Sequence, residues 1–179
     1  LIEVGYIFDD YVGGDAQVLK SPKGVFVSGQ YAYIASNGDC GMSIIDISDP
    51  ANPVEVVYLQ DDSKGGNGTY MSLPYNIFVR GDYAYFPSWA EDALTIIDVS
   101  DPANPTEVGF IRDYRQPGGT AERLDGASFV EVAGNYAYVT TDKDWGLTII
   151  NISDPTNPFE VGHIQDEEQG GTAEGMRIM

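Results

Sequence analysis

The sequence predicts an all-β fold, a β-propeller built of four-stranded antiparallel blades. The string SDPANP occupies residues 48–53 and returns at 100–105 and, as SDPTNP, at 153–158, in steps of 52 and 53 residues. The residues on both sides repeat with it and are rich in Tyr, Val and Ile, which favour strands. A repeat slightly above 50 residues is typical of a four-stranded blade.

The first two strands of each repeat are predicted from a hairpin signal. A short apolar run (GVFV from Gly24, NIFV from Asn76, SFVEV from Ser128) ends at a glycine followed by a small polar residue, and the string YAY follows at once. Glycine in a two-residue turn supplies the positive φ that a tight hairpin requires. We therefore expect an antiparallel pair at the start of each repeat.

The third strand carries apolar residues on both of its alternating faces. Its three copies read MSIIDI, LTIIDV and LTIINI. A strand without polar alternation is buried on both sides, as it is in a blade that lies between two other blades. This strand therefore points to a row of stacked blades.

The SDPANP string is predicted to form a corner between the third and fourth strands. The serines (Ser48, Ser100 and Ser153) are expected to cap a single helical turn, and the second proline to end it, because proline cannot continue a helix. Asp46 and Asp98, at the end of the third strand, are expected to accept hydrogen bonds from turn amides.

The fourth strand sets the boundaries of the array. VEVVYL, TEVGFI and FEVGHI share a pattern with IEVGYI near the N-terminus. Residues 1–179 are therefore predicted to form a single repeat array, with full blades at 24–60, 76–112 and 128–165, the last strand of a preceding blade at 1–7 and the first strand of a following blade at 175–179. Propellers have about 4–8 blades, so neighbouring copies, or the remainder of a longer chain, are expected as partners through the open strand edges.

Composition and charge exclude several classes of function. The chain carries 28 Asp and Glu against 9 Lys and Arg, for a net charge of −19. Such a surface repels phosphate backbones and anionic lipid, so no nucleic-acid partner is expected. No apolar run reaches the ~20 residues of a spanning helix, so membrane insertion is not expected either. The single cysteine, Cys40, is interpreted as a passive loop residue, and no disulfide is available.

The strings LTIIDVSDPANPTEVG from Leu94 and MSIIDISDPANPVEVV from Met42 resemble the LVIVD repeat, which is named for its third strand. The resemblance covers nearly the whole chain. It implies a β-propeller displayed outside the cell or secreted, in bacterial and archaeal proteins, without an enzymatic role. Two departures stand out. Asn151 replaces the motif Asp in the third repeat, and the array is too short for a complete ring.

Acidic residues precede a Gly-Gly pair in the connections between blades. Calcium prefers several oxygen ligands from carboxylates and carbonyls, and glycine lets the backbone turn tightly enough to offer them. The spacing matches no EF-hand loop, so solvated acidic turns remain the competing interpretation. Calcium is the only cofactor that the sequence suggests, with six candidate ligands: Asp9, Asp10, Asp61, Asp62, Asp166 and Glu167.

Other candidate sites are few. The residues that lead into the first strands vary between repeats and are expected to approach the central channel, which gives a ligand-face hypothesis with Tyr70, Tyr75, Arg123 and Asp125. Asn67, in the sequence Asn-Gly-Thr, is a candidate glycosylation site. His163 takes the place that Tyr6, Tyr58 and Phe110 hold in the other copies, so it is interpreted as a strand residue in an aromatic position rather than as a general base.

No catalytic, phosphate-binding or zinc-binding motif is present in the sequence. The leading hypothesis is a non-enzymatic, extracellular, structural or adhesive propeller module. It would be part of a larger chain or of a self-assembling surface structure. The alternative is a ligand-binding propeller that recognises a carbohydrate or peptide on one face of its central channel.

Overall fold

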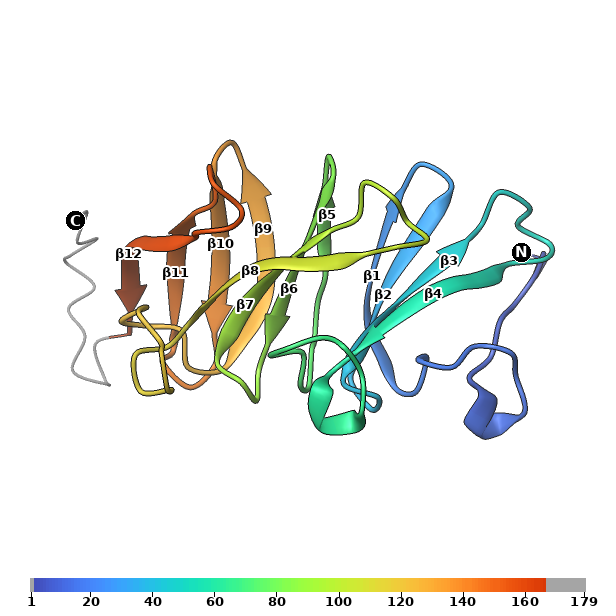
Figure 1. The fold of residues 1–179 in the computed structure, drawn as a ribbon, viewed down its shortest axis with the longest axis horizontal. Coiled ribbons are helices and arrows are strands. Elements are labelled where there is room, and N and C mark those ends of the chain that lie inside the picture. Colours follow the sequence, from blue (N-terminus) through green and yellow to red (C-terminus); the bar gives the residue numbers. More distant parts are fainter. Residues whose placement is uncertain (1, 167–179) are drawn as a thin grey trace.

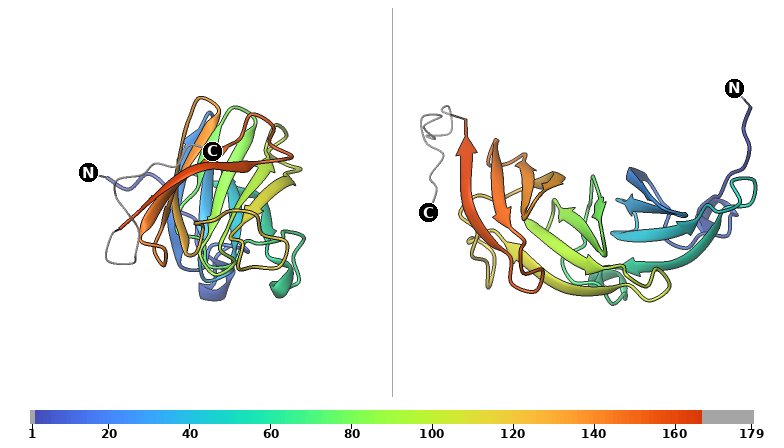
Figure 2. Two further views of the ribbon diagram at one scale, coloured as in Figure 1. Left: turned by 90° about the vertical axis from the view of Figure 1, so that its left-hand side faces the viewer. Right: turned by 90° about the horizontal axis from the view of Figure 1, so that it is seen from above.

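The structure, a computed structural model, describes residues 2–166 and shows three blades standing side by side (Figure 1). Each blade is a four-stranded antiparallel sheet of consecutive strands. Seen from above, the blades follow an arc, with β1, β5 and β9 on its concave side and β4, β8 and β12 on its convex side (Figure 2). The predicted all-β architecture of four-stranded blades is confirmed.

The strand bounds follow the repeat. Blade 1 contains β1 (Pro22–Ser28), β2 (Tyr31–Ser36), β3 (Gly41–Asp46) and β4 (Val54–Gln60). Blade 2 contains β5 (Phe78–Arg80), β6 (Tyr83–Ser88), β7 (Ala93–Asp98) and β8 (Thr106–Arg112). Blade 3 contains β9 (Ala127–Ala133), β10 (Tyr136–Thr141), β11 (Gly146–Asn151) and β12 (Phe159–Gln165). Two 3-10 turns, η1 (Asp10–Val12) and η2 (Asp62–Lys64), lie in the connections that precede blades 1 and 2.

The predicted hairpins are present at the same glycine in each blade. Gly29, Gly81 and Gly134 have φ of 59°, 57° and 58°, in the left-handed region that glycine adopts without strain. The strands that follow pair in the expected register, with Ser28 opposite Tyr31 and Arg80 opposite Tyr83.

The corners are held by carboxylates rather than by serine caps. The side chain of Asp46 accepts a hydrogen bond from Ser48 N–H, and that of Asp49 accepts one from Ala51 N–H. The segment is a turn and not a helix, so the predicted helical turn is wrong, because these Asp oxygens close the turn before a helix can begin. Asn151 Oδ1 accepts from Ser153 N–H in the same way, which explains why asparagine can stand there.

The hydrophobic core lies between the blades. One cluster joins Met42 and Ile44 of blade 1 to Ile77, Phe86 and Ile97 of blade 2. A second cluster joins blade 2 to blade 3 in the same way. It includes Leu94, Ile96, Ile111, Val130, Val139 and Ile150. Each blade therefore has a forward face, which packs on the next blade, and a backward face, which packs on the preceding one.

The segment Ile2–Ile7, predicted to be a fourth strand, forms no ladder with the described residues. It still lies where such a strand belongs. A Cβ built on Gly5 would be 2.3 Å from Pro50 O in the corner of blade 1, and one on Gly109 of β8 would be 2.2 Å from Pro155 O in the corner of blade 3. The strand assignment is absent because its third-strand partner is absent from residues 2–166. The predicted strand at 175–179 lies outside the described residues.

Candidate functional site

The connections between blades are fixed by a buried aspartate at the start of each. Asp61 accepts hydrogen bonds from Ser63 N–H at 3.0 Å and from Met71 N–H at 2.9 Å, ten residues ahead. In the same way, the side chain of Asp9 accepts a hydrogen bond from Leu19 N–H, and that of Asp113 accepts one from Leu124 N–H. Each carboxylate thus ties the two ends of its connection together and delivers the chain into the next blade.

A glutamate on the fourth strand holds the other end of the connection. Glu55 accepts from Gln17 N–H, Glu107 from Thr69 N–H and Glu160 from Glu122 N–H. A hydroxyl on the third strand binds the same stretch: Ser43, Thr95 and Thr148 donate to the carbonyls of Val18, Tyr70 and Arg123. Burial raises the pKa of Glu107, and the amide of Thr69 opposes that shift.

An ionic cluster joins blades 2 and 3. We call it the junction cluster, and its members are Asp92, Asp113, Arg115, Asp125, Lys143 and Asp144. Arg115 Nε lies 2.7 Å from Asp113 Oδ1, and Arg115 Nη2 lies 2.7 Å from Asp144 Oδ1. Lys143 Nζ lies 2.9 Å from both Asp92 Oδ1 and Asp125 Oδ1. The two cations therefore connect the β6–β7 turn, the blade 2–3 connection and the β10–β11 turn.

The pKa values in the junction cluster follow from burial and pairing. Burial by itself raises the pKa of Asp113, but hydrogen bonds from Arg115 and Leu124 outweigh it, so the pKa is lowered. For Asp92 burial is likewise outweighed, by Lys143 and the amide of Gly126. The pKa of Asp125 is raised by burial and by its neighbour Asp92. Asp113 and Asp92 are therefore held ionised by their cations.

The four ligand-face candidates do not gather in one place. Tyr70 packs on Phe110 with ring centroids 4.6 Å apart and lies under the Arg112 guanidinium. Asp125 belongs to the junction cluster. Arg123 donates to Gln165 Oε1 and to Glu122 O. It also lines, with Tyr114 and Glu122, a hollow of about 370 Å³ that the other three candidates do not line. Tyr75 is half-buried in the connection that precedes β5.

The calcium candidates are spread along the chain. Asp9 and Asp61 are buried and bind backbone amides, whereas Asp10 and Asp62 are exposed in the first turns of η1 and η2. Asp166 is exposed after β12, and Glu167 lies outside the described residues. Within residues 2–166, no three His, Cys, Asp or Glu side chains converge as metal ligands would. Calcium binding stays a prediction, with no ligand set formed by these side chains.

Three further residues are placed by the structure. Asn67 is exposed in the turn after η2, and its glycosylation stays a prediction. His163 faces Thr148 on β11, the position at which Tyr58 faces Ser43 and Phe110 faces Thr95, and its Nδ1 lies 2.6 Å from Glu160 Oε1. Cys40 is buried in the β2–β3 turn and is a free thiol.

The comparison with known protein families agrees with the division of the chain into three blades. The LVIVD repeat matches residues 20–60, 75–113 and 126–166, which is more than half of the chain and coincides with the three blades. The chain belongs to the LVIVD repeat family. Among curated proteins, none matches this chain.

Solved structures show the same fold for this LVIVD chain at low identity. A functionally unknown protein from Desulfotomaculum acetoxidans DSM 771 has a TM-score of 0.63 and 15% identity over 92% of this chain and 46% of its own. A putative 6-phosphogluconolactonase from Bacteroides uniformis ATCC 8492 has a TM-score of 0.61 and 15% identity, over 81% of this chain and 41% of its own. A structure of a nidogen/laminin complex has a TM-score of 0.55 and 12% identity, over 86% of this chain and 50% of the matched chain. The chain thus spans half or less of these structures, and at such identities they show the fold alone.

The absence of spanning helices is a separate finding. Throughout the described part of the chain, residues 2–166, no helix is long and apolar enough to cross a membrane.

Proposed function

We propose that this LVIVD chain is a non-enzymatic structural or adhesive module, displayed outside the cell, that works by receiving further blades of its own family on its two open faces. The supporting observation is a difference in exposure between equivalent residues. Val25 and Val27 on β1 are 65% and 57% exposed, whereas their equivalents in blade 2, Ile77 just before β5 and Val79 in β5, are 1% and 4% exposed. Within residues 2–166, the backward face of blade 1 therefore exposes positions that blade 2 buries against blade 1.

The forward face of blade 3 is open in the same way. Ile164 on β12 is 42% exposed, but Ile111, its equivalent on β8, is 2% exposed. Trp145 in the β10–β11 turn is half exposed, whereas Cys40 and Asp92 at the same position are buried. Large contiguous apolar surfaces on soluble proteins mark interaction sites. Both ends of the arc thus repeat the surface that blades 1, 2 and 3 use to bind one another.

The non-enzymatic part of the proposal is supported by what the carboxylates already do. Four acidic side chains of the described residues that are buried or half-buried bind backbone amides or cations: Asp61 and Glu107 hold connections, and Asp92 and Asp113 belong to the junction cluster. His163 is occupied by its contact with Glu160. The extracellular part is supported by the family, by the strong negative charge and by the exposed Asn67.

The proposal is tested by the solution mass of the chain over a wide concentration range, measured by light scattering. Neighbouring copies are expected to supply the missing blades, so the chain should associate, and Val25→Lys or Ile164→Lys should weaken association at least about tenfold, because a charge would be buried. Val54→Lys is the matched control, since Val54, Thr106 and Phe159 are exposed in all three blades. A monomer at every concentration would overturn assembly, and antibody labelling of intact cells tests the location.

A further inference from the structure

The connection between blades 2 and 3 differs from the other two connections and borders a hollow. Its aspartate and the leucine whose amide that aspartate binds, Asp113 and Leu124, are 11 positions apart, whereas the equivalent pairs in the other connections are 10 apart. The hollow has a volume of about 370 Å³ and is lined by Tyr114, Glu122 and Arg123. Sites for small ligands occupy roughly 300–1,000 Å³, so this hollow is large enough to hold one.

The three lining residues are found together in this connection alone. The connections align on the isolated bridge that follows each of their aspartates. In this alignment Tyr114 stands where the other two copies carry a second aspartate, and Arg123 stands where they carry Val18 and Tyr70. Glu122 replaces two uncharged polar residues. The lining of the hollow is therefore a local departure from the repeat and not a consequence of the blade pattern.

Each lining side chain has binding capacity that the fold does not use. Arg123 donates from Nε to Gln165 Oε1 and from Nη1 to Glu122 O, and within residues 2–166 its Nη2 has no acceptor. Glu122 is exposed, and no donor among the same residues reaches its carboxylate. Tyr114 is 56% exposed, although the Arg115 guanidinium lies 5.4 Å from its ring centroid. The hollow thus offers a donor, an acceptor and an aromatic ring.

The hollow is held in shape at both ends of the connection. At one end, Arg115 pairs with Asp144 and fixes the turn that contains Tyr114. At the other end, the carboxylate of Glu160 accepts a hydrogen bond from Glu122 N–H. A site that is already ordered loses less conformational entropy when a ligand binds. The junction cluster therefore has a second effect, which is to preorganise the hollow.

The hollow lies on the convex side of the arc. Both Glu160 and Gln165, which hold Glu122 and Arg123, belong to β12, the outermost strand of blade 3 (Figure 2). The inner strand β9, on the concave side, contributes no residue to the described lining. This surface is therefore different from the channel face on which the sequence placed a ligand.

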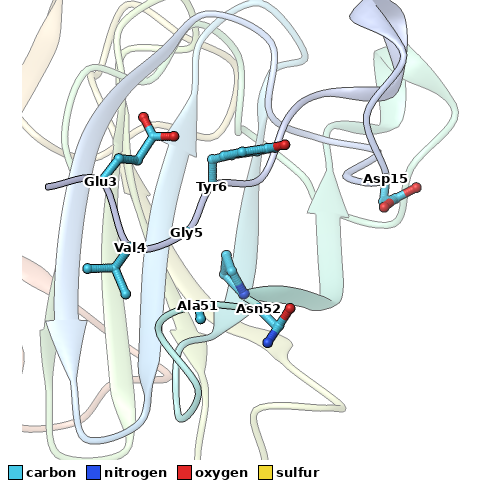
Figure 3. A pocket seen from close by; sticks show the side chains of 8 residues that line it. Glu3, Val4, Gly5, Tyr6, Asp15, Ala51 and Asn52 are labelled. Atoms are coloured by element: carbon cyan, nitrogen blue, oxygen red, sulfur yellow. The ribbon is translucent and has the colours of Figure 1, made fainter.

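A second hollow in the same chain provides a comparison. It has a volume of about 500 Å³ and lies between residues 2–7 and the corner of blade 1 (Figure 3). Its described lining also contains a glutamate and an exposed tyrosine, Glu3 and Tyr6, but no basic side chain. The side-chain amide of Asn52, which lines it, already donates to Asp49. This second hollow therefore lacks a free cationic donor such as that of Arg123.

We propose that Tyr114, Glu122 and Arg123 form a binding site for a neutral saccharide. The apolar C–H face of a sugar ring fits the exposed ring of Tyr114, and sugar hydroxyls, which both donate and accept, fit Glu122 and Arg123. The net charge of −19 repels anionic glycans, which favours the neutral class. The inference rests on the adhesive part of the proposed function and names its ligand class.

The test is isothermal titration calorimetry of the 179-residue chain with neutral pentasaccharides of glucose, mannose, xylose and N-acetylglucosamine. At least one of them is expected to bind with a dissociation constant below about 1 mM. Tyr114→Ala should weaken this binding about tenfold, because the ring contact is lost. Arg123→Met should weaken it about fivefold, because the donor is lost while the apolar stem remains. Tyr114→Phe, which keeps the ring, should bind about as tightly as wild type.

The matched control is Tyr6→Ala, which removes an equally exposed tyrosine from the hollow without an arginine and should leave binding unchanged. The absence of binding for all four sugars at about 5 mM overturns the site. Binding that Tyr114→Ala leaves unchanged, or that Tyr6→Ala weakens as much, also overturns it. Tighter binding of a galacturonic acid pentamer than of any neutral sugar overturns the neutral class.

These outcomes are distinguishable from those of the proposed function. A chain that stays monomeric and binds a sugar through Tyr114 supports the saccharide site and overturns assembly by neighbouring copies. A chain that associates and binds none of the sugars overturns the saccharide site and leaves the open faces intact.

Discussion

Arg115 and Asp144 meet across the junction of blades 2 and 3, with Arg115 Nη2 2.7 Å from Asp144 Oδ1 while the same guanidinium binds Asp113. Both carboxylates are nearly inaccessible, with side chains 5% and 1% exposed. One half-exposed cation therefore balances two buried anions from different elements.

Arg115→Ala should reduce the free energy of unfolding by about 2–3 kcal/mol, because it leaves two buried carboxylates without their cation. Urea titration followed by tryptophan fluorescence measures the change. Lys64→Ala, which removes one positive charge from the exposed turn η2, is the control and should cost less than about 0.5 kcal/mol. Equal losses in the two variants would show that net charge, and not the pairing, stabilises the junction.

Asp113 should make the chain sensitive to acid. Its folded pKa is lowered below the unfolded value of about 3.9. Such a group contributes stability that is fully present above the unfolded pKa and is lost as the pH falls through the folded pKa. Asp113→Asn should therefore lose less stability than wild type between about pH 4 and pH 2, although it starts lower at pH 7. Parallel stability curves for the two proteins would contradict this assignment.

Glu107 should have the opposite dependence. Burial raises its pKa, so its contribution to stability is fully present below the unfolded value and is lost as the pH rises through the folded one. Glu107→Gln keeps an oxygen for Thr69 N–H and removes the half-buried charge. Its melting temperature should exceed that of wild type by a few degrees at pH 7 and match it near pH 3.5. A lower melting temperature at pH 7 would mean that the charge itself is needed to hold the connection.

Asp61 and its neighbour Asp62 provide a test of the connection and of calcium together. Asp61→Ala should cost about 2 kcal/mol, because the buried Met71 N–H loses its acceptor, whereas the exposed Asp62→Ala should cost little. The sequence predicts calcium at Asp62, so calcium at millimolar concentration should raise the melting temperature of wild type but not that of Asp62→Ala. An unchanged melting temperature in wild type would contradict calcium binding by these side chains.

The blades could be predicted from sequence because their signals are local and repeated. Gly29, Gly81 and Gly134 mark the hairpins, and the third-strand pattern of Ile44 and Ile96 indicates burial on both faces. The helical turn predicted at Ser48 was wrong because Asp46 and Asp49 accept hydrogen bonds from the amides of Ser48 and Ala51, and residue preference alone does not decide which side chain binds these amides.

The candidate site was harder to predict because its contacts are between distant residues. Asp61 was interpreted as a metal ligand, and its actual partner, Met71 N–H, is ten residues away and is brought back only by the turn. The junction cluster was missed. Its one signal was that Arg115 and Lys143 have no cationic counterpart in the first two copies, which carry Tyr11 and Ser63 in place of Arg115 and Gly38 and Ala90 in place of Lys143. Only this departure from the repeat pattern could have indicated the junction cluster in the sequence.

The hydrogen bonds by which an aspartate and a glutamate hold each described connection have a mechanical consequence. Within a blade the strands are joined edge to edge by main-chain hydrogen bonds, whereas neighbouring blades are held by side-chain packing and a few clips such as Asp61–Met71. A chain pulled from its ends would therefore yield one blade at a time. Each step would release one repeat of 52 or 53 residues, roughly 180 Å of extended chain.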